Sequence, residues 1–125
     1  MRRTSKFRNK FVEIDGTVFR LTKTSKYRNK FVEIDGIVFR SDKQARRYQD
    51  LKLLLRAGTI HDLKWQVPYD LIVEGVKICR YVADFTYRDM DGRLVVEDVK
   101  GFRTREYEIK SRLMLACLKI RVLET

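Results

Sequence analysis

The sequence predicts an α/β protein in which two helices pack on a mixed β-sheet, in the order α-β-β-β-α-β, preceded by β-hairpins. Three observations support this fold class. The chain has 125 residues, of which 44% are apolar, which is enough for one hydrophobic core. It contains one proline and six glycines, a composition that argues against disorder. From residue 41 onward, helical and strand-like apolar patterns alternate, which favours a mixed sheet covered by helices.

The N-terminal region contains a tandem copy of itself. Residues 4–20 read TSKFRNKFVEIDGTVFR and residues 24–40 read TSKYRNKFVEIDGIVFR, so fifteen of the seventeen positions are identical. Such similarity implies a recent duplication. We therefore expect residues 24–125 to form one domain and residues 1–23 to be a duplicated N-terminal hairpin or arm.

Each copy is predicted to form a β-hairpin. Asp15-Gly16 and Asp35-Gly36 are typical of a two-residue type I′ turn, because both central positions need positive φ. In the second copy this turn places four apolar side chains on one face: Val32, Ile34, Ile37 and Phe39. Thr17 replaces the isoleucine in the first copy. We expect the first copy to be an ordered extra hairpin that packs at the edge of, or replaces, the equivalent hairpin of a partner chain.

Ser41 and Gln44 form a capping-box pattern that predicts the start of a helix. Apolar residues then recur at helical spacing, and Gly58 is expected to end the helix as its C′ residue. The inward-facing positions of this helix are Ala45, Tyr48, Leu51 and Leu55.

Strand-like segments follow at residues 63–67, 69–73, 76–87 and 93–99, with a turn at Glu74-Gly75. Thr104 is expected to cap a second helix. Its inward face is predicted to carry Ile109, Leu113 and Ala116. A last strand is expected at residues 119–123.

The net charge of +11 is concentrated in the N-terminal third. Residues 1–47 carry 14 basic and 5 acidic side chains, whereas residues 48–125 carry 14 and 12. This distribution suits binding to a polyanion such as DNA, and it equally suits a solubilising surface. The candidate DNA-binding residues are Arg2, Arg3, Lys6, Arg8, Lys10, Lys26, Arg28 and Lys30.

Several classes of protein are excluded. No apolar stretch is long enough to cross a membrane, and the first residues lack the apolar run of a signal peptide. Cys79, Cys117 and the single His61 provide neither a Cys/His zinc site nor a disulfide framework. This cysteine usage suits the cytoplasm.

The segment most informative about chemistry is YVADFTYRDMDGRLVVEDVK, residues 81–100. Asp84 interrupts an apolar strand, and Asp98-Val99-Lys100 ends the next one. Asp98 and Lys100 should share a face at a separation of about 7 Å, because side chains alternate along a strand. Carboxylates that converge at a strand end are suited to Mg²⁺, whereas Asp98 and Lys100 alone would make an ordinary ion pair.

The turn between these two strands decides which acid faces Asp84. A two-residue turn at Asp91-Gly92 would place Asp84 on the same face as Glu97. A three-residue loop, Met90-Asp91-Gly92, would place Asp84 opposite Asp98. Both turns are chemically allowed, and the acid-x-lysine spacing favours Asp98.

Ala83-Asp84 and Asp98-Val99-Lys100, set in this order of elements, resemble the PD-(D/E)xK nuclease superfamily and its restriction-endonuclease-like fold. Residues 24 to about 123 resemble small phage and prophage proteins related to Holliday-junction resolvases of the phage endonuclease I type. The resemblance implies a Mg²⁺-dependent DNA endonuclease, with Mn²⁺ as a plausible substitute. It also implies a homodimer that acts on branched DNA in the cytoplasm of a bacterial host.

The resemblance further implies a role for each site residue. Asp84, Asp98 and the carbonyl of Val99 would hold the metal beside the scissile phosphate. Lys100 would orient or deprotonate the attacking water and stabilise the developing charge. Gln66 occupies a polar position near the site, and Lys110 could reach a phosphate.

The sequence departs from the family pattern at two positions. Ala83 replaces the motif proline, a change that the superfamily tolerates. Gln44 stands where relatives carry a metal-binding glutamate, so it either lines the site or serves only as a helix cap. Two alternatives to a resolvase therefore remain open: a nuclease without junction preference, and a nucleic-acid-binding module that is catalytically weak or inactive.

Overall fold

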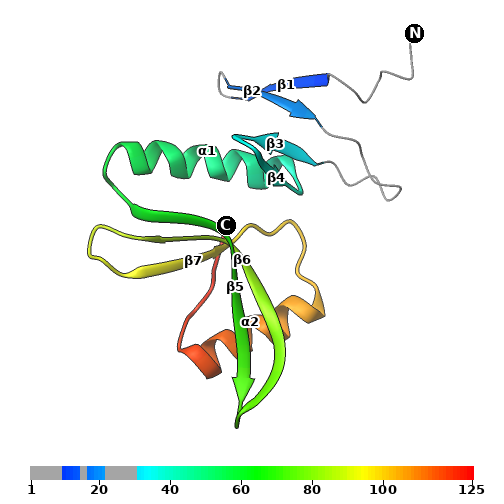
Figure 1. Ribbon diagram of the computed structural model, residues 1–125, viewed down its shortest axis with the longest axis vertical. Coiled ribbons are helices and arrows are strands. Elements are labelled where there is room, and N and C mark those ends of the chain that lie inside the picture. The colour runs from blue at the N-terminus through cyan, green and yellow to red at the C-terminus, as the bar shows by residue number, and fades with distance from the viewer. Residues whose placement is uncertain (1–9, 15–16, 22–30) are drawn as a thin grey trace. The chain divides into compact units, whose positions relative to one another are not determined.

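The computed structural model describes residues 10–14, 17–21 and 31–125, and Figure 1 shows their arrangement into helices and strands. The chain comprises two compact units, Met1–Asp50 and Leu51–Thr125. The elements are β1 (Lys10–Ile14), β2 (Thr17–Leu21), β3 (Val32–Ile34), β4 (Ile37–Phe39), α1 (Asp42–Arg56), β5 (His61–Val73), β6 (Val76–Arg88), β7 (Leu94–Asp98), α2 (Arg105–Leu118) and β8 (Leu123–Glu124). From α1 onward the order is α-β-β-β-α-β, and the predicted fold class is confirmed.

The second copy of the repeat forms the predicted hairpin. Asp35 and Gly36 have φ values of 54° and 79°, as a type I′ turn requires. The turn pairs Val32 with Phe39 and Ile34 with Ile37 across the two strands. Val32, Ile34 and Phe39 are buried, so the predicted apolar face is the packed face.

The first copy extends the same sheet. β1 and β2 pair antiparallel from Lys10↔Leu21 to Ile14↔Thr17, and β2 then pairs antiparallel with β3. The strand order in the first unit is therefore β1-β2-β3-β4. The extra hairpin lies at the edge of an equivalent hairpin, as expected, but that hairpin belongs to its own chain. The predicted turn at Asp15-Gly16 lies outside the described residues.

The predicted caps of α1 are both present. Ser41 Oγ accepts the backbone N–H of Gln44 at 3.2 Å, and Gln44 Oε1 accepts the backbone N–H of Arg40 at 3.0 Å. At the other end, Gly58 has φ 80°, and Thr59 N donates to Leu54 O at 2.9 Å. Together with Gly58 N to Leu55 O at 3.1 Å, this is a Schellman motif.

The second unit is built on a sheet of order β5-β6-β7-β8, in which β7 and β8 are parallel. β5 and β6 form a long hairpin closed at Glu74 and Gly75, whose φ values are 51° and 78°. The sequence suggested two separate strands at 63–67 and 69–73, but β5 is continuous. Pro68 does not interrupt it because β5 is an edge strand, whose outer N–H groups need no partner in the sheet.

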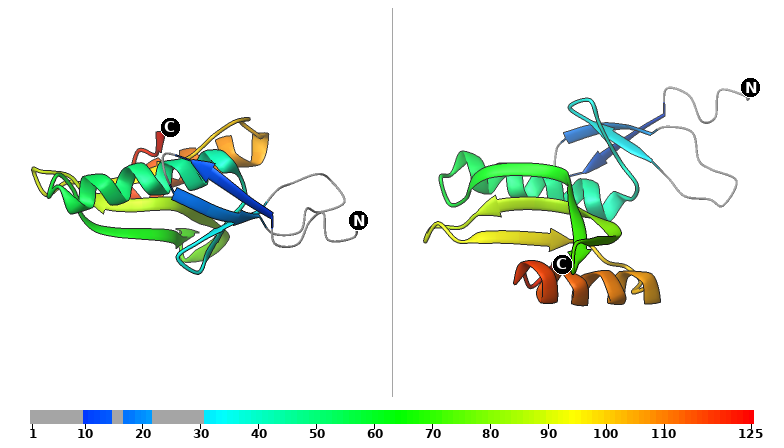
Figure 2. Two further views of the ribbon diagram at one scale, coloured as in Figure 1. Left: turned by 90° about the horizontal axis from the view of Figure 1, so that it is seen from above. Right: turned by 60° about the horizontal axis from the view of Figure 1, so that its bottom comes forward.

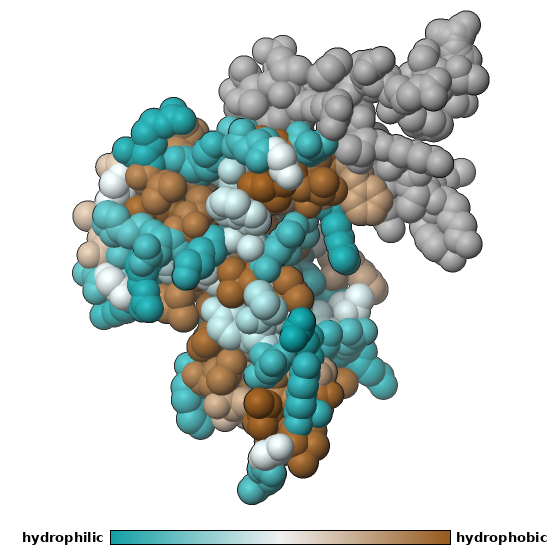
Figure 3. All heavy atoms as spheres, in the orientation of Figure 1, coloured by the Kyte–Doolittle hydropathy of each residue, from teal (hydrophilic) through white to brown (hydrophobic). Residues whose placement is uncertain are grey.

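The free end of the β5–β6 hairpin exposes apolar side chains. Ile72, Val73, Val76 and Ile78 are each at least 40% exposed. Figure 3 shows brown apolar surface toward this end of the hairpin, at the bottom of the view. Asp70 forms ion pairs with Lys77 and Arg80 in the same part of the hairpin.

α2 lies along one face of this sheet, as the right-hand view of Figure 2 shows. Thr104 caps it as predicted, since its side chain accepts the backbone N–H of Tyr107 at 3.0 Å. The buried face differs from the prediction: Ile109 and Ala116 are exposed, and Leu113 is half-buried. Tyr107 and Met114, seven residues apart, are the residues that α2 buries.

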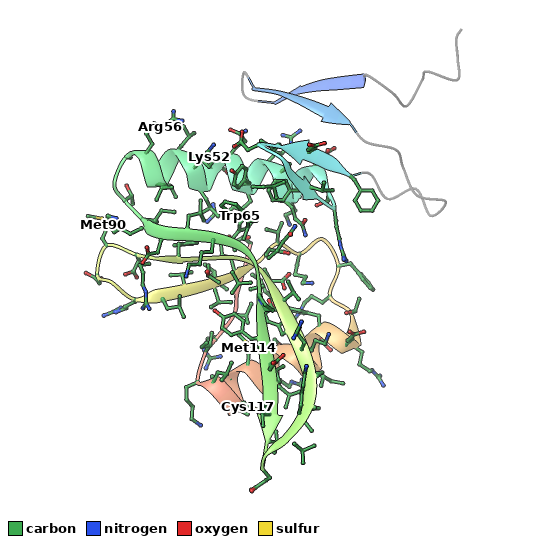
Figure 4. The ribbon with its side chains drawn as sticks, viewed as in Figure 1. Lys52, Arg56, Trp65, Met90, Met114 and Cys117 are labelled. Carbon is green, nitrogen blue, oxygen red and sulfur yellow. The ribbon has the colours of Figure 1, made fainter. Side chains whose placement is uncertain are left out.

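The core of the second unit forms between α2 and the sheet. Its buried members are Leu71, Tyr81, Ala83, Val96, Tyr107 and Met114. Figure 4 shows Met114 on α2 beside the strands. The buried stripe of α2 differs from the predicted one because Tyr107 and Met114, which lie seven residues apart on one side of the helix, carry larger side chains than Ala116. Larger apolar side chains gain more free energy from burial.

The last strand is shorter and later than predicted. β8 covers only Leu123–Glu124, whereas residues 119–122 connect it to α2, with Lys119 in the left-handed conformation at φ 59°. Ile120 and Val122 still pack against the core. In the described part of the chain, no helix is long and apolar enough to cross a membrane.

Candidate active site

The loop between β6 and β7 settles the register that the sequence left open. Asp89 N donates to Arg93 O at 3.0 Å, and Gly92 has φ 81°. Met90, Asp91 and Gly92 therefore form a three-residue loop. The pairs run from Arg88↔Leu94 to Phe85↔Glu97, and one further step places Asp84 opposite Asp98.

Asp84 lies where β6 separates from β7. Its Oδ2 accepts the backbone N–H of Val99 at 2.8 Å. The Asp84 side chain, in place of a backbone carbonyl, thus makes the next hydrogen bond between β6 and the chain after β7. Burial raises the pKa of Asp84 to about 6; the Val99 N–H and Lys100 act against this rise, and the Asp98 carboxylate adds to it. The Asp98 carboxylate is thus close enough to disfavour the charged form of Asp84, an effect that a bound cation would relieve.

Asp98 is nearly fully buried and has a cation and a phenol as partners. Lys100 Nζ lies 3.0 Å from its Oδ1, and the hydroxyl of Tyr81 donates to its Oδ2 at 2.5 Å. Burial first, and then the bond to Asp98, raise the pKa of Tyr81 well above its usual range. Tyr81 therefore remains a hydrogen-bond donor and fixes the carboxylate of Asp98.

The carbonyl of Val99 lies on the same side of β7 as Asp84. Thr125 N donates to Asp98 O at 3.0 Å, and Lys100 N donates to Thr125 O at 3.1 Å. Asp98 and Lys100 thus turn their backbone groups toward β8. Because the N–H and C=O of successive strand residues point to opposite edges, those of Val99 point toward β6.

Tyr107 supports this site from α2, and sequence reasoning did not identify it. Lys100 Nζ lies 4.1 Å from the centre of the Tyr107 ring, which is a cation–π distance. The Tyr107 hydroxyl donates to Glu124 Oε2 at 3.0 Å. Tyr107, six residues after Gly101, belongs to no motif, so only the docking of α2 reveals its role.

Glu97, the rival of Asp98, lies on the other face of β7. It is fully buried, accepts a short hydrogen bond from Tyr87 and accepts the hydroxyl of Thr125 at 3.2 Å. Neighbouring strand residues project to opposite faces. The structure brings Asp84, Asp98 and Lys100 together and leaves Glu97 out of that group.

The remaining candidates have separate positions. Gln66 is exposed, adopts φ 53° and occupies the β5 position opposite Asp84, between the pairs Trp65↔Phe85 and Val67↔Ala83. Lys110 forms an ion pair with Glu106 at 2.9 Å, one turn earlier on α2. Gln44 belongs to the first unit, where its side chain completes the cap of α1.

Most candidate DNA-binding residues lie outside the described residues: Arg2, Arg3, Lys6, Arg8, Lys26, Arg28 and Lys30. Lys10 is the first residue of β1. Their role in binding stays a prediction.

The oxygen atoms of this site suit a hard cation that binds only a few protein groups and keeps water as its other ligands. Across residues 10–14, 17–21 and 31–125, no group of three or more His, Cys, Asp or Glu side chains could hold a metal ion. Asp84 and Asp98 supply two carboxylates, and Val99 offers a carbonyl oxygen on the β6 edge of β7. Mg²⁺ commonly binds through one or two carboxylates and keeps several waters, so these residues suit it better than a metal that needs a complete protein cage.

The chain matches a known protein family. A family model described as a protein of unknown function, DUF1064, matches residues 24–121. The chain belongs to the DUF1064 family. No curated protein matches the chain.

The DUF1064 match begins at residue 24, where the second copy of the repeat starts. It contains Gln44, Gln66, Asp84, Asp98 and Lys100. The candidate site thus lies entirely within the part of the chain that is shared with the family.

Proposed function

We propose that this DUF1064 protein is a Mg²⁺-dependent DNA endonuclease of the PD-(D/E)xK type, acting as a homodimer on branched DNA in the cytoplasm. The observation that carries the proposal is the convergence of Asp84, Asp98 and Lys100. The Val99 N–H binds Asp84 at 2.8 Å and Lys100 binds Asp98 at 3.0 Å. An acid from each of two strands and a lysine two residues later form an arrangement that could hold a metal ion and a proton acceptor beside a phosphodiester.

The chain's own groups account for three parts of the chemistry. Asp84, Asp98 and the Val99 carbonyl would hold the metal, which supplies Lewis-acid polarisation of the scissile phosphate. Lys100 would orient the attacking water, accept or hold its proton, and stabilise charge on the phosphate. Tyr81 and Tyr107 would hold Asp98 and Lys100 in place.

The two-fold symmetry of a four-way junction supports a dimer. Symmetric cutting of a four-way junction needs two sites related by a two-fold axis, and this chain carries one set of Asp84, Asp98 and Lys100. Within a dimer, each protomer would cut one strand.

The proposal is tested by incubating the protein with a labelled four-way junction and with a linear duplex, with and without Mg²⁺. We expect Mg²⁺-dependent cleavage of the junction. Asp84→Asn and Lys100→Ala should each abolish it while DNA binding largely persists. Asp91→Asn, which removes one exposed charge from the β6–β7 loop, is the matched control and should cleave normally. Full cleavage by the Asp84 or Lys100 variant would overturn the assignment.

A nucleic-acid-binding module with a weak or inactive site is the second candidate function. One observation favours it: Gln44 serves the cap of α1, because its side-chain Oε1 accepts the backbone N–H of Arg40 and its backbone N–H donates to Ser41 Oγ. An amide in place of a carboxylate also binds Mg²⁺ less well. Metal-independent junction binding without any cleavage would support this candidate.

A further inference from the structure

The loop that connects β7 to α2 exposes an aromatic side chain immediately after the candidate site. Phe102 is 78% exposed, the highest value among the exposed large apolar residues of the described chain. It follows Lys100 by two residues and precedes Arg103. The loop is the yellow-to-orange segment between β7 and α2 on the right of Figure 1. A phenyl ring this exposed contributes little to the fold, because burial is the source of its stabilising effect.

The loop is fixed on both sides of Phe102. Before it, Val99 N is bound to Asp84 at 2.8 Å and Lys100 N to Thr125 O at 3.1 Å. After it, Arg103 Nη2 lies 3.4 Å from Glu124 Oε2, and Thr104 caps α2. The chain on both sides of Phe102 is therefore anchored, and ordering the loop on a ligand costs little entropy.

Three basic side chains lie near Phe102: Lys100, which pairs with Asp98; Arg103, which pairs with Glu124; and Arg105. Lys100 and Arg103 lie 4.1 Å and 6.0 Å from the centre of the same Tyr107 ring, so both charges lie close to the loop. Arg105 is exposed at the start of α2. Proteins that bind single-stranded nucleic acids combine aromatic side chains, on which bases stack, with cations that contact phosphates.

The short separation of Phe102 from Lys100 along the chain relates Phe102 to the reaction. Two residues span at most about 7 Å, and successive phosphates of one duplex strand advance by about 3.4 Å along the axis. Because the lysine and phenylalanine side chains extend this distance, a base stacked on Phe102 would lie within a few nucleotides of a phosphate held at Lys100.

We propose that Phe102 stacks on an unpaired nucleobase beside the scissile phosphate and thereby selects branched over fully paired DNA. The inference rests on the proposed function and names its substrate class. In a continuous duplex every base already stacks on its neighbours, so Phe102 gains a partner only where a branch point leaves a base free.

The test compares Phe102→Ala, Phe102→Leu and Phe102→Trp in the full-length chain. Binding to a four-way junction that carries 2-aminopurine at the branch point is measured in an Asp84→Asn background, and cleavage is measured in the native background. A linear duplex of the same sequence is the second substrate. Met90→Ala is the matched control, because Met90 is 77% exposed and lies in the β6–β7 loop at the left of Figure 4.

We expect Phe102→Ala and Phe102→Leu to weaken junction binding by about tenfold or more, as for loss of one base–aromatic stack. Binding to the duplex should stay within about twofold. Phe102→Trp should retain junction binding and 2-aminopurine quenching, and Met90→Ala should behave as the native chain.

Four outcomes would overturn the inference. Phe102→Leu equal to the native chain would show an apolar contact rather than stacking, and an equal loss on junction and duplex would show general DNA contact. Junction cleavage unaffected by Phe102→Ala would remove the inference and leave the proposed function intact. If the native chain neither bound nor cleaved DNA, both would fail.

Discussion

The hydroxyl of Tyr81 donates to Oδ2 of Asp98 at 2.5 Å, deep in the core between α2 and the sheet. Lys100 occupies the other oxygen of the same carboxylate at 3.0 Å. Asp98 is thereby held from two sides, and a core residue that carries no motif determines the orientation of a candidate metal ligand.

Tyr81→Phe is expected to lower junction cleavage while preserving the fold. The change removes one hydrogen bond to a buried carboxylate, which costs about 1–3 kcal/mol of unfolding free energy. Urea denaturation measures the loss, and cleavage at saturating Mg²⁺ measures the effect on Asp98. Tyr69→Phe, on the neighbouring strand opposite Tyr81, is the control. A Tyr81→Phe enzyme that is less stable but fully active would show that Tyr81 only supports the core.

Glu97→Gln and Asp98→Asn are expected to have different effects on cleavage, although the two acids are neighbours in the chain. Glu97 faces Tyr87 and Thr125, away from Asp84, so its amide should retain most cleavage. Asp98→Asn should abolish cleavage, since a neutral amide is a poorer ligand for Mg²⁺. Both variants are compared at equal amounts of folded protein, measured by circular dichroism. The reverse pattern would place the chemistry on the Glu97 face.

Gln44→Glu is expected to raise Mg²⁺-dependent cleavage without destabilising α1. Glutamate serves the third position of a capping box as well as glutamine does, so the bonds to Ser41 and Arg40 can persist. Gln44→Ala is the control for the cap and should cost about 1 kcal/mol. Cleavage is followed across a Mg²⁺ titration. Identical titrations for Gln44→Glu and the native chain would leave Gln44 with a capping role alone.

Tyr48→Phe is expected to show a stability difference that depends on alkaline pH. Tyr48 is buried and donates to Asp35 Oδ2 at 3.0 Å. Burial, then this hydrogen bond, raise its pKa from 10.0 to about 12. The protonated phenol is favoured in the fold, so its stabilising effect is fully present below pH 10 and is lost as the pH rises through about 12.

The measurement for Tyr48 is the difference in unfolding free energy between the native chain and Tyr48→Phe at pH 8, 10 and 11. The difference should be about 1 kcal/mol at pH 8, as for one hydrogen bond, and should shrink above pH 10. Because both chains share every other titrating group, a difference that stays constant to pH 11 would contradict the raised pKa.

The sequence by itself determined the local structure of this protein. Positive-φ turns at Asp35-Gly36 and Glu74-Gly75, the Ser41–Gln44 cap, the Gly58 helix end and the Thr104 cap each depend on a few adjacent residues, and all occur where the sequence predicts them. The order α-β-β-β-α-β follows from these boundaries. The acid-x-lysine triplet was visible for the same reason, since its spacing is a property of one strand.

Only the tertiary structure decided which residues meet across elements. The choice between Glu97 and Asp98 depended on a one-residue difference in the β6–β7 loop, and a one-residue slip moves a side chain to the other face of a sheet. The sequence predicted that α2 buries Ile109 and Ala116, whereas the structure buries Tyr107 and Met114. The reason is that the sheet packs against the helix stripe that fills its surface best. Tyr107 joins the site through that docking, and Tyr81 joins it through the pairing of β6 with β7. Both contacts depend on packing between separate segments and leave no local pattern in the sequence.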